Sequence, residues 1–136
     1  MNKPILLDTH AFHWLALGDE QLPVRLRSAA VGAPLYVSAV AAWELAIHVR
    51  KGRLTFLPTL PVWFEQALVA LPAKVVPLTH EIAFQGEALP AFHGDPADRF
   101  QVATALVNGY RLMTVDGKIE AWAKKGPGKA LGLTLV

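Results

Sequence analysis

The chain has 136 residues, of which 53% are apolar and 18% are charged. This length predicts a single domain over residues 1–136 with enough apolar side chains to form a core, and the composition excludes an intrinsically disordered chain. Cysteine is absent, which excludes disulfides, thiolate metal sites and cysteine nucleophiles. An oxidising compartment is therefore not required.

The apolar stretches are short. The first ends at Asp8, and later ones are interrupted by Glu44, Pro72 or Lys74, so we expect no signal peptide, no membrane span and a cytoplasmic protein. Thirteen Lys and Arg against eleven Asp and Glu give a net charge of +2. If four acids gather in one site, thirteen basic residues face seven acidic ones elsewhere, a weak indication of a polyanionic ligand.

In chain order, short apolar runs alternate with segments of helical periodicity. Three consecutive aliphatic residues at 5–7 predict a strand buried on both faces of a parallel sheet. A helix over 10–17 ends at Gly18, Pro23 opens a second helix over 24–31, and a second strand follows at 35–37. Ser38 then caps a long helix that runs to about residue 51.

The second half continues this alternation. After a loop over 53–60, we predict a helix over 61–71, a strand over 75–77 and a helix that Thr79 caps and that ends before Pro90. A helix from Asp95 to about residue 107, a strand over 112–115, a short helix to residue 125 and a last strand over 133–135 follow. The pattern predicts an α/β fold, with a mainly parallel central sheet covered by helices on both faces.

Two aspartates directly follow predicted strands. Asp8 ends the first strand and Asp116 ends the fourth, which puts both at the carboxyl edge of the sheet, where open α/β sheets bind ligands. Each aspartate also has a structural interpretation as the N-cap of the next helix. Neither residue alone decides between the two interpretations.

Glu44 is the one formally charged residue between positions 39 and 49. Its neighbours at helical spacing include Val40, Ala41 and His48, so it lies beside the apolar stripe of its helix. An ionised carboxylate there needs a partner, because burying an unpaired charge costs free energy. The alternative is a glutamate at the solvent edge, paired with His48 or a distant arginine.

The helix predicted from Asp95 carries a second acid, Asp98, in its first turn. Asp95 suits an N-cap, and Asp98 gains from the helix dipole, so both have a structural explanation. However, Asp98 shares a helical stripe with Val102 and Ala105, which directs its side chain inward at the same edge of the sheet.

Four acids thus share one edge: Asp8, Glu44, Asp98 and Asp116. Carboxylates in one site repel each other unless a cation neutralises them. Oxygen ligands favour Mg²⁺ or Mn²⁺. A site of this kind activates water for displacement at a phosphodiester, with one or two ions.

Four motifs surround these acids: Leu6-Leu7-Asp8-Thr9-His10; Val37-Ser38-Ala39 with Trp43-Glu44-Leu45-Ala46; Gly94-Asp95-Pro96-Ala97-Asp98-Arg99; and Leu112-Met113-Thr114-Val115-Asp116. In order and spacing they resemble the PIN-domain ribonucleases, and within these the VapC-type toxins of bacterial type II toxin–antitoxin pairs. The resemblance runs from the first strand to the last. It implies a three-layer α/β/α sandwich with strand order 3-2-1-4-5, metal-dependent cleavage of RNA, frequent homodimers and inhibition by a cognate VapB-type antitoxin.

The resemblance also implies roles for single residues. It gives Asp8, Glu44, Asp98 and Asp116 the catalytic and metal-binding roles, with Mg²⁺ or Mn²⁺ as cofactor. Thr9, Asp95 and Thr114 are expected to support these ligands, and for Asp95 a capping role stays open. The expected RNA contacts are His10, Arg50, Lys51, Arg53 and Arg99.

Other groups of residues have alternative interpretations. His10 and His13, with Asp8, suggest zinc, but the spacing places no third nitrogen ligand. The tryptophans at 14, 43, 63 and 122 could stack on bases, although we expect them in the core, where aromatic residues at helical spacing usually lie. The basic residues at 50, 51 and 53 either bind phosphate or offset the helix dipole.

Two other classes of protein remain open. A phosphotransfer receiver domain needs a pair of acids after its first strand, and a haloacid-dehalogenase-type phosphatase needs an aspartate where this chain has His10. A non-catalytic PIN-like module that binds RNA or protein is harder to exclude. Four carboxylates at one edge, however, have no evident use in binding an anion without a metal.

Overall fold

The computed structural model describes residues 3–136, so the first two residues of the predicted domain lie outside the described residues. Its centre is a four-stranded sheet of β1 (Ile5–Leu7), β2 (Leu35–Ser38), β3 (Ala73–Val76) and β4 (Arg111–Met113). The strand order is β3-β2-β1-β4, and all three strand pairs are parallel. The predicted α/β class and the central position of the first strand are confirmed.

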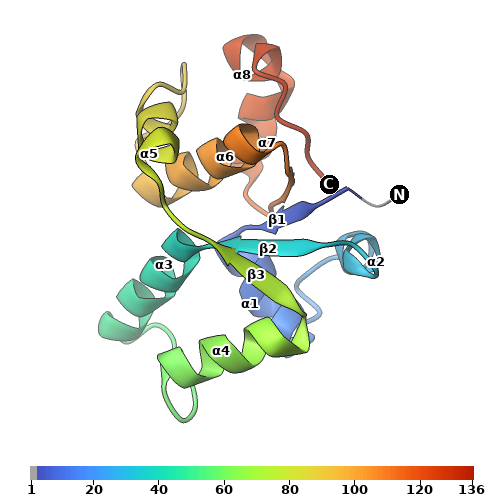
Figure 1. Ribbon diagram of the computed structural model, residues 1–136, viewed down its shortest axis with the longest axis vertical. Coiled ribbons are helices and arrows are strands. Elements are labelled where there is room, and N and C mark those ends of the chain that lie inside the picture. Colours follow the sequence, from blue (N-terminus) through green and yellow to red (C-terminus); the bar gives the residue numbers. More distant parts are fainter. Residues whose placement is uncertain (1–2) are drawn as a thin grey trace.

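Helices cover both faces of this sheet (Figure 1). One face carries α1 (Thr9–Leu17), α2 (Val24–Ala30), α3 (Ala39–Arg50) and α4 (Leu60–Ala70), and the other carries α5 (His80–Glu87), α6 (Pro96–Asn108), α7 (Gly117–Lys124) and α8 (Gly126–Ala130). In Figure 1 the helices α5 to α8 lie above the sheet, and α1, α3 and α4 lie below it. The architecture is the three-layer sandwich that the family resemblance implied.

Strand β1 contributes to the cores on both sides. Ile5 and Leu7 pack with the helices of the first face and Leu6 with those of the second, and all three are fully buried. Successive side chains of a strand point to opposite faces, so a strand covered on both sides has to be apolar at every position. Burying each such side chain contributes about 1.5–3 kcal/mol, which holds β1 in the centre.

The third strand runs from Ala73 to Val76 instead of over the predicted 75–77, and two further predicted strands differ at the sheet's margins. The predicted last strand is reduced to one parallel bridge, in which Leu135 pairs with Leu112. The fourth strand ends at Met113 instead of residue 115, because the next residues leave the ladder. The N–H of Val115 donates instead to the Asp8 carboxylate, at 3.3 Å.

Helix α8 was not predicted, because its sequence contains glycine and proline, which disfavour helices. Gly128 lies so close to Trp122 that an added Cβ would be 2.1 Å from the Trp122 carbonyl oxygen. A glycine is therefore required for the contact between α8 and α7. Local sequence shows the residue but not the contact that explains it.

Three of the four tryptophans lie in or against the cores as expected, namely Trp14, Trp63 and Trp122. The expectation is wrong for Trp43, whose exposed fraction is 51%. Within the part of the chain that the structure describes, no helix has the length and apolar character that crossing a membrane requires.

Candidate active site

Asp8 is fixed where β1 ends. Its N–H donates to the Met113 carbonyl of β4 at 3.0 Å, its Oδ1 accepts from the N–H of Ala11 at 2.8 Å, and its Oδ2 accepts from Val115. Burial raises the pKa of Asp8, although the Thr114 hydroxyl and the two amides act against this shift. Asp8 therefore caps α1, as the structural interpretation held, and also places a buried carboxylate at the carboxyl edge of the sheet.

Asp116 occupies the equivalent position after β4. Its Oδ1 accepts from the N–H of Lys118 at 2.7 Å and so caps α7. The N–H of Asp116 donates to the Thr114 Oγ1 at 3.0 Å. Thr114 thus contacts both aspartates, and its expected role in supporting metal ligands stays a prediction.

Asp98 lies in the first turn of α6. Its Oδ2 is 2.8 Å from the Nε2 of His93. Burial raises the pKa of Asp98 to about 6, the charges of Asp95 and Asp116 act in the same direction, and His93 opposes them. Asp98 and Asp116, from different elements, are therefore close enough to repel each other.

Asp95 caps α6. Its Oδ1 accepts from the N–H groups of Ala97 at 2.9 Å and Asp98 at 3.4 Å. This geometry is the capping role that the sequence left open, and it fixes the turn that carries Asp98.

Glu44 is held by side chains alone. The hydroxyl of Thr9 donates to the Glu44 Oε1, and the Nε2 of Gln101 donates to the Thr9 Oγ1 at 2.8 Å. Thr9 and Gln101 are buried, and the three residues join α3, α1 and α6. Glu44 therefore has the partner that its helical position called for, but this partner is Thr9 and neither His48 nor an arginine.

Sequence reasoning missed Gln101. The available signal was its place on α6 one turn after Asp98, on the inward stripe of that helix. His93 was also missed. It lies in the loop before α6, where no helical or strand periodicity indicates that its ring contacts Asp98.

Arg99 lies next to Asp98 and is partly buried. Its Nε donates to the His93 carbonyl at 2.9 Å, and its terminal nitrogens donate to the carbonyls of Gly86 at 3.0 Å and Phe92 at 2.8 Å. These bonds tie the loop before α6 to α5. The arrangement favours a structural role for Arg99 over the predicted RNA contact.

The other predicted RNA contacts are exposed. Arg50, Lys51 and Arg53 lie at and after the end of the Glu44 helix. His10 is exposed at the start of α1, with its ring centroid 6.3 Å from that of His48. Their contact with RNA stays a prediction.

The zinc interpretation finds no support. His13 is buried, with its ring centroid 5.1 Å from that of Phe56 and 5.5 Å from that of Trp63. Among residues 3–136, no three His, Cys, Asp or Glu side chains are grouped closely enough to hold an ion as they stand.

The donor chemistry of the edge nevertheless fits Mg²⁺ or Mn²⁺. The donors at this edge are carboxylate oxygens, one of them buried and two repelling each other. Mg²⁺ usually binds through one or two carboxylates and several waters rather than in a closed protein cage. An open acidic edge is therefore compatible with this ion without a preformed cluster of three ligands.

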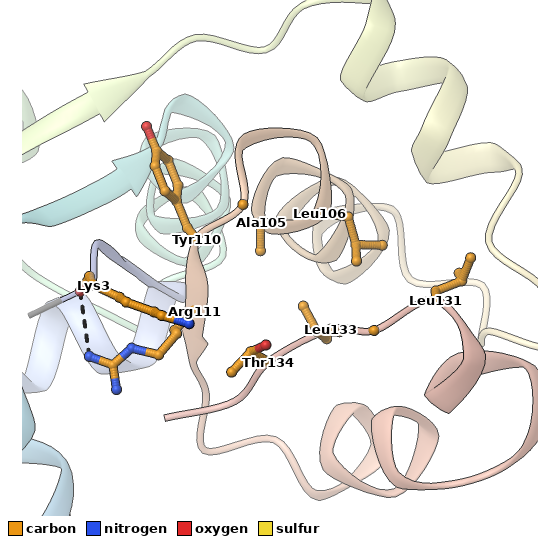
Figure 2. Close-up of a pocket in the computed structure, with 10 residues that line it drawn as sticks. Lys3, Ala105, Leu106, Tyr110, Arg111, Leu131, Leu133 and Thr134 are labelled. Carbon is orange, nitrogen blue, oxygen red and sulfur yellow. Dashed lines mark hydrogen bonds between the residues drawn. The ribbon is translucent and has the colours of Figure 1, made fainter.

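A separate hollow of about 150 Å³ lies at the opposite, amino edge of the sheet (Figure 2). Its lining includes Lys3, Tyr110, Arg111 and Thr134 and contains no acidic residue. This hollow is chemically unsuited to a cation, in contrast to the acidic edge, whose carboxylates make it the candidate active site.

These features define an α/β domain with an acidic site at the carboxyl edge of a parallel sheet. The family model described as PIN domain matches residues 5–125, which include all four acids. The chain belongs to the PIN-domain family. Its similarity to the VapC-type ribonucleases is also confirmed, because it is 33% identical to Ribonuclease VapC22 of Mycobacterium tuberculosis over 119 residues, or 86% of this chain and 90% of that protein.

Solved structures share the fold. VapBC2 from Rickettsia felis bound to a DNA fragment from its promoter aligns with a TM-score of 0.65 at 13% identity, covering 97% of this chain and 96% of that one. FitAcB from Neisseria gonorrhoeae aligns with a TM-score of 0.60 at 20% identity, covering 96% and 95%. A toxin–antitoxin complex from Klebsiella pneumoniae gives 0.53 at 20%, covering 82% and 86%.

Proposed function

We propose that this PIN-domain protein is a Mg²⁺- or Mn²⁺-dependent endoribonuclease and the toxin of a type II toxin–antitoxin pair. The observation that carries the proposal is the placement of Asp8, Asp98 and Asp116 at one sheet edge, with Glu44 tied to the residue after Asp8. The identity with Ribonuclease VapC22 supports RNA as the substrate.

Asp8, Glu44, Asp98 and Asp116 would hold the ion. A bound ion of this kind supplies an activated water and stabilises charge on the phosphate. Burial makes an ionised Asp8 unfavourable without a cation, and the repulsion between Asp98 and Asp116 acts in the same direction. His93 orients the Asp98 carboxyl through its Nε2.

The exposed basic residues supply the contacts with the RNA backbone in this proposal. Arg50, Lys51 and Arg53 lie at and just after the end of α3, the helix that carries Glu44. In this proposal, a strand of RNA with its scissile phosphate at the acidic edge extends toward them. Their charges offset those of the phosphates and make binding dependent on salt. The proposal includes a cytoplasmic location, where the protein would meet cellular RNA.

Two protein partners belong to the proposal. The first is a VapB-type antitoxin, supported by structural neighbours that are toxin–antitoxin complexes. The second is another copy of this chain, supported by an apolar hollow of about 320 Å³ that Trp43 and Leu78 help to line. Their exposed fractions of 51% and 44% are large for residues of this kind.

Cleavage of a single-stranded RNA by the purified protein tests the function. We expect products in Mg²⁺ or Mn²⁺ and none in EDTA, and cleavage by Asp8→Asn that is slower by roughly 100-fold or more in either ion. Glu65→Gln, which changes an exposed acid of α4, serves as the matched control and should cleave like the wild type. Binding of RNA without cleavage in any metal would favour the non-catalytic PIN-like module.

A further inference from the structure

Gln101 is a buried polar residue in the middle of α6, with an exposed fraction of 2%. Its Nε2 donates to the Thr9 Oγ1 at 2.8 Å, and the Thr9 hydroxyl donates to the Glu44 Oε1. Its own Oε1 is buried and finds no hydrogen-bond partner among residues 3–136. The amide nitrogen of Gln101 thus donates to Thr9, while its amide oxygen has no donor among the described residues.

The direction of these hydrogen bonds follows from the number of protons. An amide nitrogen can only donate, so Gln101 makes the Thr9 oxygen an acceptor and leaves the single hydroxyl proton for Glu44. With the amide turned over, the Gln101 Oε1 would compete with Glu44 for that proton. The orientation in the structure is therefore the one in which Thr9 can donate to Glu44.

This arrangement is unfavourable for stability. A buried carbonyl oxygen without a donor costs free energy, and Ala97 and Ala105, which lie one turn before and after Gln101 on the same face of α6, are buried apolar residues. A methionine of similar length would fit this environment without an unpaired polar atom. Polar groups that weaken a core in this way are expected mainly at functional sites.

We propose that Gln101 is a positioning residue of the acidic site, which acts through the Thr9 hydroxyl to hold the Glu44 carboxylate in one orientation for the metal ion. The inference rests on the proposed function. Gln101 does not itself bind the ion or the RNA. Residues that orient a metal ligand by hydrogen bonds typically change metal affinity about 10–100-fold when they are replaced.

The test compares Gln101→Met, Thr9→Val and the double variant with the wild type. The dissociation constant for Mn²⁺ is measured by titration calorimetry, and the melting temperature is measured in EDTA. We expect each single variant to bind Mn²⁺ about 10–100-fold more weakly and Gln101→Met to melt no lower than the wild type. The double variant should bind no more weakly than the weaker single variant, because both changes break the same chain of hydrogen bonds.

Two controls separate positioning from packing. Thr104→Val removes another buried hydroxyl of α6, which donates to the Phe100 carbonyl at 2.6 Å, and should leave the Mn²⁺ dissociation constant unchanged. Thr9→Ser keeps the hydroxyl and should bind Mn²⁺ like the wild type. Gln101→Leu also removes both polar atoms of the amide and replaces Gln101→Met in the test if Gln101→Met does not fold. Saturating Mn²⁺ should restore much of the RNA cleavage by Gln101→Met.

The outcomes are distinguishable. A wild type that neither binds Mn²⁺ nor cleaves RNA contradicts the proposed function. If the wild type is active and Gln101→Met has an unchanged Mn²⁺ dissociation constant, only the positioning role is overturned. The same holds if the losses of Mn²⁺ affinity in the two single variants add up in the double variant. A Thr9→Ser variant that binds as weakly as Thr9→Val overturns it too.

Discussion

Asp8 and Glu44 lie at the same edge of the sheet but are held in different ways. Asp8 accepts hydrogen bonds from the backbone N–H groups of Ala11 and Val115, which are present whatever the side chains of those residues. Glu44 is held by the Thr9 hydroxyl, which Gln101 holds in turn. One half of the site therefore follows from the path of the chain, and the other depends on side chains from three helices.

The largest effect is expected where the backbone holds the ligand. Asp8→Asn keeps the size of the side chain but removes a charge that the ion needs, and ion contributions of several kcal/mol correspond to a loss of cleavage of roughly 100-fold or more. Stability in EDTA should change little, because removing a buried charge offsets the loss of one acceptor. Cleavage rates in Mg²⁺ and melting curves in EDTA check both statements, and cleavage at the wild-type rate would contradict the metal role of Asp8.

Glu44→Gln should have a smaller effect, since it weakens one ligand that side chains hold. Ions that bind the native state raise its melting temperature, so we expect a smaller Mn²⁺-induced rise in this variant and little change in EDTA. Glu65→Gln is the control and should keep the full rise. If Glu44 were only a structural residue, the variant would lose stability in EDTA and keep its response to Mn²⁺.

Arg99 offers a third way of holding the site, because its side chain binds backbone carbonyls. Lysine cannot reproduce the planar fork of donors, so Arg99→Lys should lower the free energy of unfolding by about 1–3 kcal/mol, measured in urea. The exposed Arg50→Lys is the control and should unfold like the wild type. If Arg99→Lys unfolds like the wild type but binds RNA more weakly, Arg99 contacts RNA, as the sequence alone suggested.

The smallest expected effect concerns Asp98 and pH. Burial and the charges of Asp95 and Asp116 raise the pKa of Asp98 to about 6 from an ordinary value of 3.8. The folded state then binds the proton more tightly than the unfolded state, so this contribution to stability is present in full below about pH 3.8 and is lost as the pH rises through about 6.

Melting curves of the wild type and Asp98→Asn in EDTA isolate this group. As the pH rises from about 5 to 7, the melting temperature of Asp98→Asn should increase relative to that of the wild type. In Mn²⁺ the wild type should show the opposite dependence, because the ion needs the ionised carboxylate. A difference that is independent of pH would show that Asp98 has an ordinary pKa.

Features of the fold that depend on a few consecutive residues are predicted well from the sequence. The apolar run of β1 indicates a strand covered on both faces, and Asp8 and Asp116 follow strands, so their shared edge follows from parallel pairing. Helix α8 was missed because its glycine is explained by a contact with Trp122 that local sequence does not show. The short predicted last strand kept one bridge.

The partners of Glu44 were beyond local reasoning. Thr9 and Gln101 are 92 residues apart. The place of Gln101 one turn after Asp98 puts it near the acidic edge, but nothing in the local sequence pairs it with Thr9. The exposure of Trp43 is a similar case, because a tryptophan at helical spacing looks the same in sequence whether it lies in a core or on the surface. The candidate acids, Glu44 included, can be found from sequence, whereas the distant side chains that hold Glu44 can be found only from the fold.

A crystal of the wild-type protein soaked in Mn²⁺ tests most directly whether the two halves of the edge form one metal site. We expect an anomalous difference peak at the carboxyl edge of the sheet, with carboxylate oxygens of Asp8 and of at least one of Glu44, Asp98 and Asp116 about 2.0–2.2 Å from it. A peak bound only by other residues, or a protein that cleaves RNA in EDTA and binds no Mn²⁺ at this edge, would contradict the metal-dependent site.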